Sequence, residues 1–314
     1  MNKVIEIGRI AAPGILLLIV FLFATAPLAE GCLALSEKGV VGVNNEVAVI
    51  IWDKSHQTEH FIRSVSLDSK YANAGFLVPT PTTPELAVAD ARIFDLAESY
   101  LPIPRTLNVV LAKVLPASNT DGLEPRVVAE QDIGDYHAVV LDAADATGLG
   151  AWLKKNGYPW TESSARWLAP YLAVKWKITA FKLNRSASGE LGTHAIRMSF
   201  TTDRPFFPYR EPAEASKLGD PNRVLRIALL SDERIVGKLG DGTNWTAHLD
   251  FAGSSTPPSY IRLDKNNWLI YAGLSDKPGI RLPARLTYFS DHSNPRPGQS
   301  DLFFSRSPDQ SNSP

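Results

Sequence analysis

His56, Glu59 and His60 form the pattern H-x-x-E-H. In zinc peptidases with this pattern, two histidines one helical turn apart bind the metal and the glutamate activates a water molecule. Residues i and i+4 lie about 6 Å apart on a helix. Along a strand they lie about 13 Å apart, which is too far to share one ion. The motif therefore supports zinc chemistry only if residues 56–60 are helical.

The residues around the motif favour strands instead. The run VAVIIW precedes it, the run FIRSVSL follows it, and the polar stretch between them is typical of a hairpin loop. The preferred interpretation is a solvated turn with no metal or other cofactor. The alternative is a zinc-dependent hydrolase in which His56 and His60 bind zinc and Glu59 is the catalytic residue.

Aromatic residues beside prolines are the second group of candidates. Tyr158 and Trp160 flank one proline, and Phe206 and Phe207 lie between two others. Prolines restrict a loop before a ligand binds, and aromatic rings supply contact area at a modest entropic cost. We therefore predict that a ligand-binding surface, if the protein has one, includes these four residues and the proline-rich crossing at 79–84. The alternative is that the prolines end strands and the rings pack in the core.

The first 31 residues predict export. Residues 10–29 carry no charge, and they follow a short segment that contains Lys3 and Arg9. Such a segment is a signal peptide or a membrane anchor rather than part of a globular core. We therefore expect the protein in the periplasm or at the outer cell surface, with a membrane contact through 10–29 if the leader is not cleaved. Cys32 is a weak candidate for lipidation, and its alternative is a thiol without a role.

Composition excludes one class of partner. Lys and Arg number 32 against 33 Asp and Glu, so the chain lacks the basic excess of a phosphate-binding surface. Nucleic acid is therefore not an expected partner. The sequence also has no G-x-S-x-G and no glycine-rich nucleotide fingerprint. The expected partner is an unidentified envelope component or protein.

Strand-like and helix-like patterns alternate along the chain. Asp145 is a good N-cap for a helix that ends before Gly157, and further helices are predicted over 87–100 and 162–169. A strand is predicted over 106–114, and the segment 224–290, which includes NWLIYAGL, is predicted to be β-rich. These patterns predict an α+β fold with a largely antiparallel sheet and two or three packed helices.

The predicted organisation has four parts. Residues 1–31 are the signal peptide or anchor, and residues 32–212 are the main α+β domain. Residues 213–290 continue it as a β-rich part, either in the same domain or as a second subdomain. Residues 291–314 are rich in Ser, Pro, Asn, Asp and Gln, and this composition predicts a disordered tail.

Four blocks carry a resemblance to a known family. They are FLVPTPTTPELAVADARIFDLAES, DYHAVVLDAADATGLGAWLKKNGY, LAPYLAVKWKITAFKLN and THAIRMSFTTDRPFFPYREP. In this order they resemble the family called domain of unknown function 2330, over roughly Val47 to Pro212. The resemblance implies an exported prokaryotic protein and implies no activity. The expected function is that of an uncharacterised exported cell-envelope protein with a non-catalytic binding or structural role, and the alternative is the zinc hydrolase.

Overall fold

The computed structural model describes most of the chain after residue 32. The described residues are 33–36, 39–41, 45–64, 75–101, 123–134, 136–158, 160–183, 194–211, 223–257, 264, 266–294, 296–297 and 300–308. The predictions for the leader, for Cys32 and for the strand at 106–114 lie outside these residues. No helix within the described residues combines the length and apolar character needed to cross a membrane.

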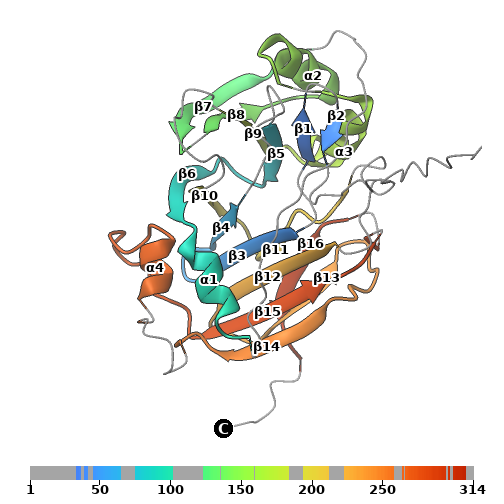
Figure 1. Ribbon diagram of the computed structural model, residues 1–314. Helices are drawn as coiled ribbons and strands as arrows, with labels where there is room; N and C mark the ends of the chain where they lie inside the picture. The colour runs from blue at the N-terminus through green and yellow to red at the C-terminus, as the bar shows by residue number, and fades with distance from the viewer. Residues whose placement is uncertain are drawn as a thin grey trace, which may run out of the picture.

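A seven-stranded sheet forms the lower half of the molecule in Figure 1. Of its described strand pairs, β3 and β12 are parallel and the others are antiparallel. In spatial order its strands are β14 (His248–Ser254), β15 (Arg285–Asp291), β12 (Val224–Ser231), β3 (Asn45–Asp53), β4 (Thr58–Ser64), β10 (His194–Thr201) and β6 (Glu85–Asp90). The predicted hairpin is confirmed as β3 and β4.

Two antiparallel sheets complete the described β structure. The six-stranded sheet contains, in spatial order, β2 (Gly39–Val41), β1 (Leu33–Ser36), β5 (Gly75–Thr80), β9 (Lys177–Leu183), β8 (Tyr136–Asp142) and β7 (Arg126–Ile133). The three-stranded sheet contains β11 (Phe206–Phe207), β16 (Leu302–Arg306) and β13 (Ile235–Leu239).

Four short helices are present in the described part of the chain. They are α1 (Arg92–Glu98), α2 (Ala146–Lys155), α3 (Glu162–Ala173) and α4 (Asn267–Tyr271). The predicted cap of α2 is confirmed, because the Asp145 side chain accepts a hydrogen bond from the Gly148 N–H at 2.7 Å. Gly157 follows this helix with a φ of 74°, which suits glycine after a helix end. In Figure 1, α2 and α3 lie over the six-stranded sheet, and α1 and α4 lie on one face of the seven-stranded sheet.

Strand β3 is covered on both faces, as its continuous apolar run predicts. Val49 and Ile51 belong to the apolar cluster beneath α1 and α4. Ala48 and Ile50 point the other way, into a cluster shared with the other two sheets. The seven-stranded sheet is therefore the central layer of the protein, and any polar side chain on either of its faces requires a physical reason.

The predicted α+β class needs correction, because the fold is mostly β, with few and short helices. The predicted helix 87–100 begins only at Arg92, because residues 85–90 pair with β10 as an edge strand. Conversely, NWLIYAGL contributes the helix α4 rather than a strand. Tertiary pairing outweighs local propensity in these short segments.

The predicted disordered tail at 291–314 is also wrong for residues 302–306. Leu302 and Phe304 are buried in the core, and β16 is the central strand of the three-stranded sheet. The prediction rests on the average composition of residues 291–314, which does not reflect the short apolar run at 302–304. Within the predicted β-rich part 213–290, β12 pairs directly with β3, so it lies in the same sheet as the first hairpin.

Candidate functional site

The H-x-x-E-H motif lies in a turn and a strand. His56 is in the turn between β3 and β4, where Gln57 has a φ of 47°, and Glu59 and His60 are in β4. Neighbouring residues of a strand point to opposite faces of the sheet. The Glu59 carboxylate accepts a hydrogen bond from the Phe206 N–H at 2.8 Å in the protein interior, so it points away from His60. The residues of the motif therefore do not converge on one point.

The described residues contain no group of three or more His, Cys, Asp or Glu side chains that is arranged to hold a metal ion. Burial raises the pKa of Glu59 well above its ordinary value, and only the hydrogen bond from Phe206 opposes this shift. A water-activating glutamate needs an ionised carboxylate next to the metal. The geometry of the described residues thus does not assemble the zinc site given by the alternative interpretation of the motif.

The strand places His60 in a different arrangement, at the edge of a cleft of about 320 Å³. The walls of this cleft come from the β3–β4 hairpin, the ends of β10 and β6, and the loop after α4. Twelve described residues line it: Asp53, His56, Thr58, His60, Thr83, Glu85, Ser199, Phe200, Thr201, Lys277, Pro278 and Ile280.

The floor of the cleft is a polar row that crosses three strands. His60 on β4 is directly opposite Ser199 on β10, and Ser199 is directly opposite Glu85 on β6. Residues paired in this way lie on the same face of the sheet. In the other direction, His60 is opposite Ile51, which belongs to the apolar cluster. The face thus changes from apolar to polar at His60.

His60 is held firmly at one ring nitrogen. Its Nδ1 lies 2.8 Å from the Ser199 hydroxyl oxygen, and its Nε2 is buried without a hydrogen-bond partner among the described residues. The side chain is 3% exposed. Burial, reinforced by the nearby Arg197, lowers the pKa of His60 to about 4, so the ring is neutral at physiological pH.

The charged groups of the cleft are paired within the protein. At one side, Asp53 accepts hydrogen bonds from the Ser55 hydroxyl and the His56 backbone, and its Oδ2 lies 2.6 Å from His56 Nδ1. Burial alone would raise the pKa of Asp53, but these hydrogen bonds outweigh burial and lower it. The acid is therefore ionised and already occupied.

At the other side, Glu85 forms ion pairs with Lys277 and with Arg197, the latter at 3.0 Å. The hydrogen bond from Lys277 is the main cause that lowers the pKa of Glu85. Arg197 is 1% exposed and also donates to the backbone oxygens of Ala272 and Gly273 at the end of α4. These contacts fasten the loop after α4 to the sheet edge.

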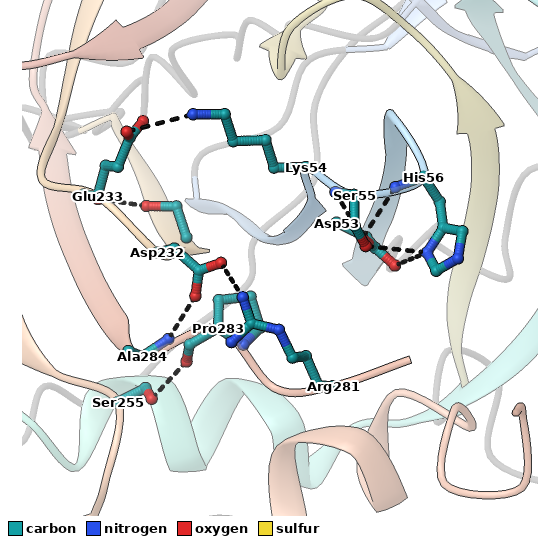
Figure 2. A network of polar contacts seen from close by, with 11 residues as sticks. Asp53, Lys54, Ser55, His56, Asp232, Glu233, Ser255, Arg281, Pro283 and Ala284 are labelled. Carbon is teal, nitrogen blue, oxygen red and sulfur yellow. Dashed lines mark hydrogen bonds and ion pairs between the residues drawn. The ribbon is translucent and has the colours of Figure 1, made fainter. Parts of the chain in front are cut away.

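A polar network connects the two walls of the cleft outside its floor (Figure 2). Lys54, next to the Asp53–His56 pair, forms an ion pair with Glu233 at 3.2 Å. The neighbouring Asp232 accepts hydrogen bonds from Arg281 at 2.7 Å and from the Ala284 N–H at 3.2 Å. The hairpin turn and the segment that follows the cleft loop are therefore both joined to the β12–β13 turn.

The predicted aromatic surface does not exist. Tyr158, Trp160, Phe206 and Phe207 are between 0% and 8% exposed. Tyr158 stacks on Trp152 in the cluster beneath α2 and α3. The two phenylalanines form β11, which pairs with β16. The prolines beside them therefore mark the ends of a strand and do not hold the rings in solvent.

Sequence reasoning singled out His56 and His60 but missed Ser199, Glu85 and Lys277. A signal for part of the cleft was present in AIRMSFT, where Arg197 and Ser199 occupy one face of an otherwise apolar strand. No local signal connects this strand with residue 277, because the contact depends on the long-range position of the loop after α4.

The fold and site define a mostly β protein with a polar cleft at one end of its central sheet. The chain belongs to the family described as an uncharacterized protein conserved in bacteria, domain of unknown function 2330, whose sequence model matches residues 26–266. The resemblance found in the sequence is confirmed.

No curated protein matches the chain. Among solved structures, it is similar to a mutated baculovirus P35 after caspase cleavage, with 8% identity, a TM-score of 0.40, and coverage of 83% of this chain and 99% of that one. It is also similar to baculovirus P35, with 9% identity, a TM-score of 0.37, and coverage of 85% and 97%. These TM-scores are too low to support an argument about this protein.

Proposed function

We propose that this chain is an exported bacterial cell-envelope protein that binds a ligand in the cleft without covalent chemistry. The uncharged segment 10–29 behind Lys3 and Arg9 supports export. The leader is either removed on export or retained as the membrane anchor. Membership of a bacterial family agrees with a prokaryotic envelope, and the ligand is an envelope component.

The observation that carries the binding role is the polar row His60, Ser199 and Glu85. The equivalent row on the next strands is Ile51, Leu230 and Leu286, all in the apolar cluster. His60 and Ser199 are buried, whereas Glu85 is exposed at the sheet edge and paired with Lys277 and Arg197. Burying a polar group costs free energy unless it finds a partner, and His60 Nε2 has none among the described residues. A ligand that completes the hydrogen bonding of this row explains its presence.

Binding fits this geometry better than catalysis does. A general base works best with a pKa near the operating pH, and the pKa of His60 is about 4. Among the described residues no carboxylate contacts its second ring nitrogen, so the orienting acid of a serine triad is missing. The two cleft carboxylates are occupied by His56 and Lys277. The described residues do not bring together the ligands that a zinc hydrolase would need.

Cell fractionation tests the location. The full-length chain carrying a C-terminal tag is expected in the periplasmic, membrane or surface fraction, and the mass of its N-terminal peptide distinguishes cleavage, lipidation and retention. Recovery of the uncleaved chain in the cytoplasmic fraction alone would overturn the proposal.

Cosedimentation with isolated envelope material tests the cleft. Thr83 and Thr201 are exposed and line the cleft, so Thr83→Trp and Thr201→Trp fill it without entering the core. Thr147, exposed on α2, provides the matched control Thr147→Trp. We expect wild type and the control to sediment with the envelope and both cleft variants to remain in solution. Equal sedimentation of all four proteins, or of none, contradicts binding at this site.

A further inference from the structure

We propose that the ligand of the cleft is a neutral sugar unit of an envelope polysaccharide. This inference rests on the proposed function and assigns its ligand class. Three properties of the cleft carry it: the pairing of its charges, the chemistry of its remaining polar groups, and its size and apolar side.

The charges of the cleft disfavour an ionic ligand. The described lining residues that carry a formal charge at neutral pH are Asp53, Glu85 and Lys277. Asp53 is bound to His56, and Glu85 is bound to both Lys277 and Arg197. An anionic ligand would meet the carboxylates of Asp53 and Glu85. A cationic ligand would compete with the hydrogen bonds that Asp53 accepts and with the two ion pairs of Glu85, which costs free energy. A neutral ligand leaves every pair intact.

The remaining polar groups suit hydroxyls. Thr58, Thr83, Ser199 and Thr201 line the cleft, and each hydroxyl both donates and accepts hydrogen bonds. A sugar hydroxyl also donates and accepts, so it can form a hydrogen bond with each of these side chains either as the donor or as the acceptor. His60 adds a buried ring nitrogen without a partner, fixed in place by the Ser199 bond at Nδ1. His60 contributes to the floor of the cleft, and a ligand hydroxyl that reached this nitrogen would supply the missing partner in either tautomer.

The size and the apolar side of the cleft suit one sugar ring. A volume of about 320 Å³ is at the lower end of small-molecule sites. Pro278 and Ile280 supply carbon surface on the lining, against which the C–H face of a pyranose packs. The neighbouring Thr83 and Thr201 are exposed, so the cleft is open to solvent and a chain extends from the bound ring.

Fractionation of the envelope of the source bacterium tests the ligand class. Protease-treated envelope is separated on an anion exchanger into unretained neutral polysaccharide and retained acidic polysaccharide, while peptides and lipids are collected separately. Each fraction is titrated by calorimetry into the full-length protein, into Thr201→Trp and into Thr147→Trp. We expect binding of the neutral polysaccharide by wild type and by Thr147→Trp, and an affinity at least tenfold weaker for Thr201→Trp.

Salt dependence provides a second readout. Because no charge is exchanged, we expect the affinity for the neutral fraction to change less than about twofold between about 0.05 and 0.5 M salt. If cleft-dependent binding is found in the acidic, peptide or lipid fraction, the sugar assignment is wrong and the proposed binding function survives. If Thr201→Trp does not weaken the binding of any fraction, both the sugar assignment and the proposed binding function fail.

Discussion

The free energy of unfolding of Glu59→Gln, relative to that of the wild type, is expected to increase as the pH rises. The Glu59 side chain is fully buried, and its Oε2 accepts a hydrogen bond from the Phe206 N–H. Its Oε1 has no hydrogen-bond partner among the described residues. Burial raises the pKa of this carboxyl group. The folded protein therefore keeps the proton at pH values at which the unfolded chain has lost it.

The sign and the size of the effect follow from proton linkage. In the unfolded chain Glu59 ionises at a pH of about 4.3. Below that pH Glu59 is protonated in both the folded and the unfolded state, and its full contribution to the stability of the fold is present. This contribution is lost as the pH rises through the pKa of Glu59 in the folded state. Over this interval the free energy of unfolding falls by about 1.4 kcal/mol per pH unit because of this residue. Glutamine keeps an oxygen that accepts from Phe206 and does not titrate, so the difference between variant and wild type rises with the same slope.

Urea denaturation followed by tryptophan fluorescence measures this difference at about pH 5, 6 and 7. Other titrating groups are common to both proteins and cancel in the comparison. The control is Glu162→Gln, whose wild-type side chain is 76% exposed on α3 and which should show no such slope. A difference between Glu59→Gln and wild type that stays constant over this range would refute the assigned burial and protonation of Glu59.

Substitutions at three further sites, with two comparison variants, test the fold. Arg296→Met removes the buried partner 2.8 Å from Glu46 and is expected to lower the free energy of unfolding by roughly 3–5 kcal/mol. Arg92→Met, at an exposed ion pair, should lower it far less. Asp145→Ala removes the cap of α2 and should cost about 1 kcal/mol, with Asp145→Asn restoring most of it. Phe207→Ala leaves a cavity in the core and should cost roughly 3–5 kcal/mol. Urea denaturation at neutral pH measures these losses of stability, and equal losses for Arg296→Met and Arg92→Met would contradict the buried ion pair.

Elements with strong local signals could be predicted from the sequence. The β3–β4 hairpin has two apolar runs around a polar turn, and α2 has Asp145 before it and Gly157 after it. In both cases the residues that specify the element lie within it or next to it. The prediction that β3 is covered on both faces is correct for the same reason.

Elements that depend on distant partners could not be predicted. The segment 85–90 is a strand because β10 pairs with it, and residues 302–306 are a strand because β11 and β13 pair with them. The cleft has the same origin, since its lining comes from four separate parts of the chain. The sequence identified His60 through a motif, but its contact with Ser199 spans 139 positions and depends on strand register.

Nitrogen NMR of the His60 imidazole tests the central claim most directly, because it observes the ring at the floor of the cleft. The His60 signals are assigned by their loss in His60→Phe, and the neutral polysaccharide fraction is then added. With a pKa of about 4, the ring should remain neutral above about pH 5, and its Nε2 signal should shift as the ligand saturates the cleft. The exposed His248 serves as the internal control and should not respond. An Nε2 signal of His60 that is unchanged at saturation would contradict binding in this cleft.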